Sequence, residues 1–149
     1  MGIRKLGHYS IRTTDLQASR TFYTEILGLR EGFRPPFNFP GIWLYQGGDE
    51  ADFGVVHIIG IDRDNPGGLA DYLGTREEAG LAGSGAVDHV AFLATGLDDM
   101  RSRLKGHGWA FTERTVPSLG LFQLFITDPS GVMVEMNYPH DEARSLGLA

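Results

Sequence analysis

The amino-acid sequence predicts an α+β fold in which one domain is built from two βαβββ modules. The first observation is a weak internal repeat: residues 7–16 align with residues 88–97, so that His8 falls on His89 and Leu16 on Leu97. The second observation is that each copy reads as a strand, a turn and a helix, and is followed by further strand-like segments. A repeated unit of this kind indicates two modules of the same design.

The opening strand of each copy shows the two-residue alternation of a half-buried strand. In the first copy, Tyr9 and Ile11 point to one face, which leaves His8 on the opposite face. The second copy repeats the pattern, with His89 opposite its apolar neighbours. The two histidines are therefore expected at corresponding places.

Each opening strand leads into a helix. The first helix is expected to begin at Thr14 or Asp15 as N-cap and to end at Gly28. The second is expected from about residue 97 to Gly106 or Gly108. Further strands are expected at residues 43–45, 53–61, 111–114, 121–127 and 132–137, with a strong turn at 128–131.

We expect the chain to be organised as a single domain of residues 1–149. We expect the first module at about residues 4–61 and the second at about 86–139. The connection at 62–85 is rich in Gly, Asp, Asn and Pro, although residues 69–79 could form a short helix, and residues 140–149 read as a loosely held tail.

Composition limits the functional classes. With 149 residues, 42% hydrophobic and 21% charged, the chain can bury a core without a structural metal, so a metal would serve chemistry. The net charge of -6 argues against a nucleic-acid partner. No apolar run of membrane-helix or signal-peptide length occurs, so we expect a cytoplasmic protein without a membrane partner. The absence of cysteine restricts metal ligands to nitrogen and oxygen.

Four polar residues occupy matched positions in the repeat. Residues 55–59 align with residues 133–137, which places His57 opposite Glu135, and His8 already matches His89. In a pseudo-twofold arrangement all four would point into one cleft. Imidazoles with one carboxylate suit Fe(II), Zn, Ni, Co or Mn and leave coordination positions open. Singly, each residue is more often structural, but Glu135 lies in an apolar run where a carboxylate needs a partner.

The sequence resembles the vicinal oxygen chelate superfamily, which contains glyoxalases, bleomycin resistance proteins and extradiol dioxygenases. The resemblance rests on four segments: GHYSI at 7–11, FYTEILGL at 22–29, DHVAF at 88–92 and DPSGVMVE at 128–135. It implies curled mixed sheets around a metal cleft, with one divalent ion held by His8, His89 and Glu135. It also implies a homodimer, in which the modules pair within one chain or across the dimer.

The subfamilies of this superfamily differ in the residue they carry at the position of His57. Glyoxalase-like lyases and related isomerases carry a Glu or Gln ligand at that place, so His57 would be a fourth ligand. Extradiol dioxygenases carry an acid/base His on a comparable strand, which His57 also fits. Those enzymes usually have a Tyr ten residues before the ligand Glu, where this chain has Phe125, and the histidine they place slightly earlier is missing from residues 115–124.

Three functions are weighed. The first is a metal-dependent glyoxalase-like lyase or isomerase acting on a small substrate with vicinal oxygens, with Glu135 or His57 as base. The second is a non-haem Fe(II) ring-cleaving dioxygenase, and the third is a metal-free drug-binding protein. Fosfomycin-type thiol transferases share the same three metal ligands, so their activity is a further alternative. The expected substrate contacts are Phe39, Trp43, Phe122, Phe125 and Arg114.

Each of those contacts has a plainer interpretation. The aromatic residues could belong to the core, and Arg34 and Arg114 are more often solvated surface arginines than anion contacts. The segment 33–40, with its alternating aromatic and proline residues, is expected to form a semi-rigid loop over the mouth of an apolar pocket.

Overall fold

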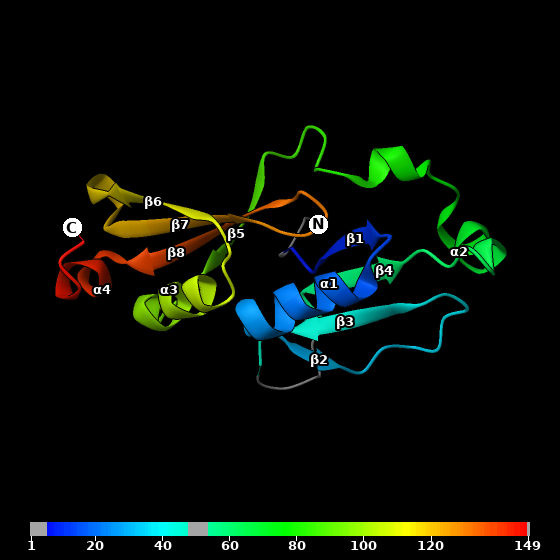
Figure 1. The fold of residues 1–149 in the computed structure, drawn as a ribbon, viewed down its shortest axis with the longest axis horizontal. Coiled ribbons are helices and arrows are strands. Elements are labelled where there is room, and N and C mark those ends of the chain that lie inside the picture. The colour runs from blue at the N-terminus through cyan, green and yellow to red at the C-terminus, as the bar shows by residue number, and fades with distance from the viewer. Residues whose placement is uncertain (1–5, 48–53, 149) are drawn as a thin grey trace, which may run out of the picture. The chain divides into compact units, whose positions relative to one another are not determined.

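The structure is a computed structural model that describes residues 6–47 and 54–148. It divides into two compact units, residues 1–81 and 82–149, and each is described by itself (Figure 1). The first unit contains β1 (Tyr9–Thr13), α1 (Leu16–Thr21), η1 (Phe22–Ile26), β2 (Arg30–Gly32), β3 (Gly41–Tyr45) and β4 (Val56–Gly60). The second contains β5 (His89–Leu93), α3 (Leu97–Gly106), β6 (Phe111–Val116), β7 (Leu121–Thr127) and β8 (Met133–Pro139). The βαβββ order is thus confirmed twice.

Both sheets have the same topology. The strand orders are β1-β4-β3-β2 and β5-β8-β7-β6, and in each sheet the first pair is parallel while the other pairs are antiparallel. Ser10 pairs with His57 in the first sheet, and Ala91 pairs with Glu135 in the second. Since Ser10 and Ala91 are matched in the repeat, the register confirms that His57 and Glu135 occupy equivalent places.

One face of each sheet is buried against a helix. In the first unit the buried face carries Ile11, Ile42, Leu44, Val56 and Ile58, and the helix side contributes Phe22, Tyr23 and Ile26. In the second unit it carries Phe122, Leu124, Ile126, Val134, Met136 and Tyr138, and α3 contributes Leu97, Met100 and Leu104. Because strand side chains alternate, the residues between these form the opposite face, which we call the open face.

The helix boundaries agree with the expected capping residues. Asp15 is the N-cap of α1, and its side chain accepts a hydrogen bond from the Ala18 amide. The helix continues into the π-turn η1, and the left-handed Gly28, with φ of 77°, ends it as expected. Helix α3 ends at Gly106. None of the described helices is long and apolar enough to cross a bilayer.

Some strand boundaries differ from the expected ones. The start of the fourth strand at residue 53 lies outside the described residues, and β4 begins at Val56. Strand β2 was not located from the sequence, because it has only three residues and two of them are exposed. Strands β6 and β8 each run two residues further, to Val116 and Pro139.

The connecting segment packs onto the first unit. It forms α2 (Pro66–Leu73) and the 3-10 turn η2 (Glu78–Leu81), so the expected helix begins and ends earlier than residues 69–79. Leu69 is buried against Phe39 and Ile59. The Arg12 guanidinium, reaching from β1, donates to the carbonyls of Leu73 and Gly74 and so holds the end of α2. Side chains of α2 are thereby fixed beside the first sheet.

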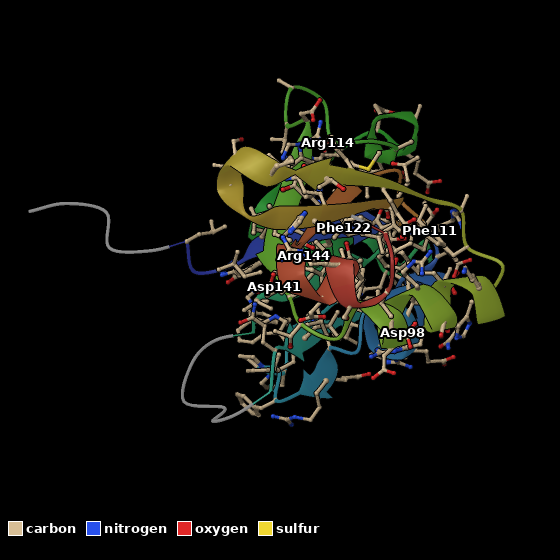
Figure 2. The ribbon with its side chains drawn as sticks, turned by 90° about the vertical axis from the view of Figure 1, so that its left-hand side faces the viewer. Asp98, Phe111, Arg114, Phe122, Asp141 and Arg144 are labelled. Carbon is tan, nitrogen blue, oxygen red and sulfur yellow. The ribbon has the colours of Figure 1, made fainter. Side chains whose placement is uncertain are left out.

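The C-terminal residues are not a loosely held tail, which corrects the expectation from the sequence. Residues His140–Ser145 form α4, and Ala143 is fully buried. The Glu142 carboxylate accepts hydrogen bonds from the amides of Gly96 and Leu97, at 2.9 and 2.8 Å, and so caps α3 from a distance of more than forty residues along the chain. Figure 2 shows the two exposed α4 side chains Asp141 and Arg144.

This remote cap gives a stability prediction. Glu142→Ala leaves two amides at the N-terminus of α3 without their acceptor, and we expect it to lower the free energy of unfolding by about 1–2 kcal/mol. Asp141→Ala is the matched control, because its carboxylate is exposed and lies 3.9 Å from Arg144 in a weak ion pair. Urea denaturation of both variants measures the effect. Equal loss in the two would contradict the role of Glu142.

Candidate metal and substrate site

The open face of the first sheet brings His8 and His57 together. The His57 ring lies between two others: it stacks on His8 with ring centroids 3.8 Å apart and on Trp43 with centroids 4.0 Å apart. The interplanar angles are 18° and 3°. Pairing of Trp43 with His57 across β3 and β4 produces this stack, because opposite residues of an antiparallel pair share a face.

His57 is held as a neutral base. The residue is 7% exposed, its Nε2 atom is buried without a hydrogen-bond partner, and the ring is hydrogen-bonded to the backbone of Gly54. Burial, together with the nearby His8, lowers the pKa of His57 to about 4. A buried nitrogen without a partner costs free energy, so a functional contact for Nε2 is indicated.

The lowered pKa predicts an acid-sensitive stability. Between about pH 6.5 and pH 4 the unfolded chain binds a proton at His57 that the folded chain does not, so stability falls as the pH falls through this interval. His57→Phe removes the linkage. We expect the difference in unfolding free energy between the wild type and this variant, both without metal, to change by on the order of 3 kcal/mol across the interval. Denaturation curves that stay parallel at all pH values would contradict the buried neutral state.

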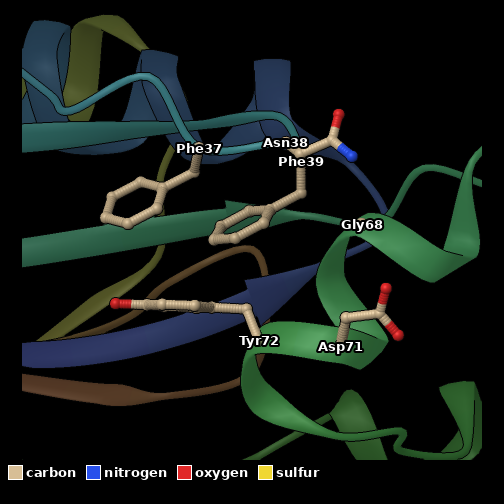
Figure 3. Close-up of a pocket in the computed structure, with 6 residues that line it drawn as sticks. All are labelled: Phe37, Asn38, Phe39, Gly68, Asp71 and Tyr72. Carbon is tan, nitrogen blue, oxygen red and sulfur yellow. The ribbon is translucent and has the colours of Figure 1, made fainter.

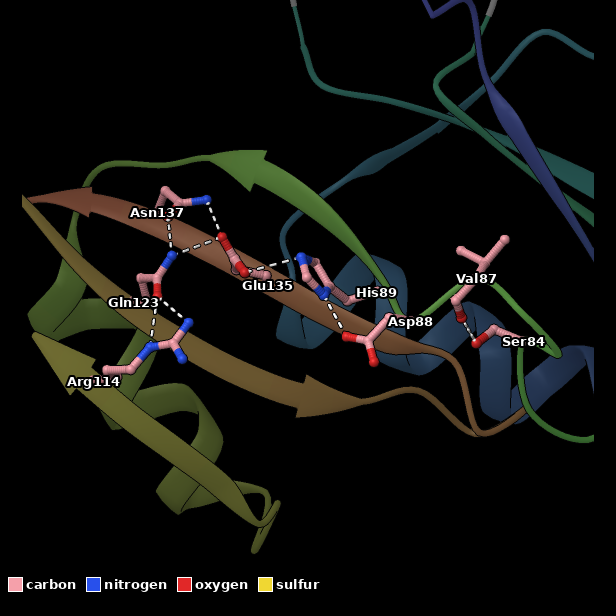
Figure 4. A network of polar contacts seen from close by, with 8 residues as sticks. All are labelled: Ser84, Val87, Asp88, His89, Arg114, Gln123, Glu135 and Asn137. Atoms are coloured by element: carbon pink, nitrogen blue, oxygen red, sulfur yellow. Dashed lines mark hydrogen bonds and ion pairs between the residues drawn. The ribbon is translucent and has the colours of Figure 1, made fainter. Parts of the chain in front are cut away.

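The open face of the second sheet brings His89 and Glu135 together. The His89 Nε2 atom lies 3.2 Å from Glu135 Oε2, and His89 Nδ1 lies 2.7 Å from Asp88 Oδ1 (Figure 4). Glu135 is buried, whereas His89 is partly exposed. His89 and Glu135 are therefore neighbours on adjacent parallel strands, whereas His8, the partner of His57, lies directly before β1.

Amide side chains orient the Glu135 carboxylate. Its Oε1 atom accepts hydrogen bonds from Gln123 Nε2 at 2.9 Å and from Asn137 Nδ2 at 2.6 Å. Gln123 is held in turn by Arg114, whose Nε and Nη2 atoms donate to Gln123 Oε1 at 2.9 and 2.6 Å. Figure 4 shows this chain of contacts from Arg114 to Asp88. The carboxylate keeps one oxygen, Oε2, for a further contact.

The geometry fits a bound cation. In the His89 tautomer that carries its proton on Nδ1, the ring donates to Asp88 and Nε2 has a lone pair. That lone pair faces a second acceptor, Glu135 Oε2, at 3.2 Å. Two acceptors this close are stable when they share a positive charge, either a proton or a metal ion. A carboxylate that fixes the far nitrogen is also usual for metal-ligating histidines.

The predicted ligands thus fall into two pairs, His8 with His57 and His89 with Glu135. Within the described residues, no group of three or more His, Asp or Glu side chains is placed to hold a metal ion. The donors with the clearest ligand geometry, His89 and Glu135, belong to the second unit.

A cavity of about 390 Å³ opens beside the first pair of histidines. Its walls come from the segment 33–40, from β3 and β4, and from α2. Phe39 and Trp43, both expected substrate contacts, lie in its wall together with Phe37, Tyr72 and Arg34. The expected placement of segment 33–40 at an apolar pocket agrees with this arrangement. Tyr72 was missed, because its place depends on how α2 packs.

Other expected contacts lie elsewhere. Phe125 is on the open face of the second sheet, with the Arg114 guanidinium 5.0 Å from its ring centroid and His89 in an edge contact. Phe122 is buried on the opposite face, against the helix, because residues three apart on a strand point to opposite sides. Gln123, Asn137 and Asp88 were not predicted, although Asn137 lies two residues after Glu135 on the same strand and so shares its face.

Comparison with known proteins defines the class. The sequence profile described as the Glyoxalase/Bleomycin resistance protein/Dioxygenase superfamily matches residues 5–136. The chain therefore belongs to this superfamily, whose members commonly bind a divalent metal ion and small molecules and are often dimers.

Individual relatives are distant. The chain is 26% identical to a lactoylglutathione lyase of Escherichia coli O157:H7, over 96% of this chain and 98% of the relative. Its fold is similar to a genomically encoded fosfomycin resistance protein of Listeria monocytogenes, with a TM-score of 0.61, 17% identity and coverage of 96% and 99%. It is also similar to an antibiotic binding protein of Streptomyces sp. CB03234, with a TM-score of 0.59, 16% identity and coverage of 93% and 98%. The two structural likenesses concern the fold alone.

Proposed function

We propose that the chain is a metal-dependent lyase or isomerase that acts on a small substrate with vicinal oxygen atoms. We assign His8, His89 and Glu135 as the ligands of one divalent ion. The observation that carries the proposal is the approach of His89 Nε2 to Glu135 Oε2, at 3.2 Å, with Asp88, Gln123 and Asn137 fixing their outer atoms. This ligand type suits Fe, Zn, Ni, Co or Mn.

Such an ion would polarise a carbonyl or enediolate oxygen of the substrate and so lower the cost of removing a neighbouring proton. We assign the removal of that proton to His57. Its ring is neutral and its Nε2 atom is free of other partners, whereas Glu135 already uses Oε1 for two amide donors. The stack with His8 and Trp43 holds the ring in a fixed orientation, which a proton acceptor requires.

One relative and one residue support this choice over ring cleavage. The lactoylglutathione lyase matches along nearly the whole chain, and Phe125 stands where ring-cleaving dioxygenases usually have a Tyr. A glutathione conjugate is one substrate to include in a test panel. The experiment described next also distinguishes ring cleavage and metal-free drug binding from the proposed activity.

The experiment uses the full chain loaded in turn with Mn, Fe(II), Co, Ni and Zn under argon. Exchange of the proton next to the carbonyl is followed by NMR in D₂O, for a panel of 2-hydroxy ketones and adducts of 2-oxoaldehydes with thiols. We expect metal-dependent exchange without oxygen. Turnover only with Fe(II) and oxygen would indicate the dioxygenase instead. Ligand binding without metal or turnover would indicate a binding protein.

A further inference from the structure

Aromatic rings dominate the cavity beside His57. Phe37 lies 5.2 Å from Phe39, 5.1 Å from Tyr72 and 6.2 Å from Trp43, measured between ring centroids. Figure 3 shows the neighbouring pocket that shares three of these rings and is also lined by Asp71: the Phe37 and Phe39 rings lie on one side and the Tyr72 ring faces them from α2. A volume of about 390 Å³ with such walls is suited to a flat apolar ring.

One permanent positive charge lies in this aromatic wall. The Arg34 guanidinium is 5.0 Å from the centroids of both Phe37 and Phe39, and its Nη2 atom donates to the Phe39 carbonyl at 2.7 Å. Gly41 makes room for it, because a Cβ atom there would lie 3.2 Å from Arg34 Nε and 2.6 Å from the Ile58 carbonyl oxygen. The Ile58 carbonyl is thus the main reason for glycine at position 41, and the same glycine leaves room for the guanidinium.

Among the described residues, Arg34 has no acidic partner. No carboxylate in the described part of the chain forms an ion pair with it, and burial lowers its pKa. The described residues that line the cavity include no Asp or Glu, although the whole chain has a net charge of -6. A guanidinium has five N–H donors, and the Phe39 carbonyl accepts from only one nitrogen. Donors therefore remain for an anion in the cavity.

We propose that the substrate of this site is an aromatic carboxylate, with its ring against Phe37, Trp43 and Tyr72 and its carboxylate on the Arg34 guanidinium. This inference rests on the proposed function, since it names the substrate class for the same site. A planar carboxylate matches the fork of an arginine, and solvent screens a half-buried guanidinium less than an exposed one.

The same contacts would arise if Arg34 only fastened the segment 33–40 to the sheet. Two probes of the same shape separate the roles: naphthalene-2-carboxylate and the neutral naphthalene-2-carboxamide. Binding of each is measured by isothermal titration calorimetry on the full chain, with and without bound metal. The variants are Arg34→Gln, Tyr72→Ala and the control Arg63→Gln, which removes an equal charge from the exposed ion pair with Glu78.

The wild type is expected to bind the carboxylate about tenfold or more tightly than the carboxamide, as for a charge-assisted pair. Arg34→Gln should remove this preference and leave carboxamide binding within about twofold, since the ring contacts stay. Tyr72→Ala should weaken both probes, and Arg63→Gln should weaken neither. Melting temperatures of the variants confirm that each is folded.

Equal affinity of the wild type for the two probes would overturn the proposal, and so would the absence of binding by either probe. An equal loss of both in Arg34→Gln would assign Arg34 a structural role. The proposed function fails separately: a chain that takes up no metal yet keeps the Arg34-dependent preference binds aromatic acids without the proposed chemistry. A chain that binds metal without the preference has the proposed site and another substrate class.

Discussion

Replacing Glu135 with Gln is expected to release the divalent ion and to reduce turnover more than any other single change. The substitution keeps the size of the side chain but removes the negative charge that faces His89 Nε2 at 3.2 Å. It also places an amide opposite the amides of Gln123 and Asn137, which both donate to Oε1 in the wild type. Loss of a residue that only hydrogen-bonds to a metal ligand typically lowers metal affinity roughly 10–100-fold. Because Glu135 is assigned as a ligand itself, we expect a larger loss.

Glu113→Gln is the matched control for that experiment. Glu113 is on β6 of the same sheet and pairs with Arg101 at 2.7 Å, away from the Glu135 network. Metal content after dialysis, measured by plasma mass spectrometry, and turnover are compared in both variants. Retention of the wild-type metal content by Glu135→Gln would show that Glu135 is held by its amide partners for a structural reason only.

His57→Phe is expected to leave a folded protein that binds metal and turns over substrate about 10²–10⁴-fold more slowly, the range for a lost acid/base group. Phenylalanine preserves the ring between His8 and Trp43 and removes a buried nitrogen that has no partner. It also loses the hydrogen bond to the Gly54 backbone. These effects oppose each other, so the stability at pH 7.5 should stay within about 1–2 kcal/mol of the wild type.

The metal content of His57→Phe separates the two roles that the sequence left open. Retained metal with lost turnover assigns His57 to proton transfer, whereas lost metal would make it a fourth ligand and contradict our assignment. His107→Phe, at the exposed C-terminus of α3, controls for the removal of a histidine elsewhere. Wild-type turnover by His57→Phe would exclude both roles.

The repeat in the sequence predicted the fold and the pairing of polar residues because both depend on local patterns. Alternation along a strand decides which face a residue occupies, and the same alignment then places His57 and Glu135 at equivalent positions in the register. The same rule, applied to residues 122 and 125, would have separated Phe122 from Phe125 at once. That error was avoidable from the sequence.

Other features depend on contacts between distant segments, which no local pattern encodes. Tyr72 enters the cavity because α2 packs on Phe39 and because Arg12 holds its end. Arg34, expected as a surface residue, lies in the cavity, where its guanidinium packs on Phe37 and Phe39 and donates to the Phe39 carbonyl. Glu142, in the segment expected to be a loosely held tail, accepts a hydrogen bond from the Gly96 amide at the start of α3. The short strand β2 gives too few residues for a pattern.

The most direct test of the central claim is the metal stoichiometry of the protein purified without chelator and without oxygen, before and after reconstitution with Fe(II), Zn, Ni, Co or Mn. The account predicts about one divalent ion per chain in the wild type and none in Glu135→Gln, as for a site with three protein ligands and open positions. A wild-type protein that holds no metal even after reconstitution would contradict the account. His8, His89 and Glu135 would then be structural residues of a metal-free binding protein.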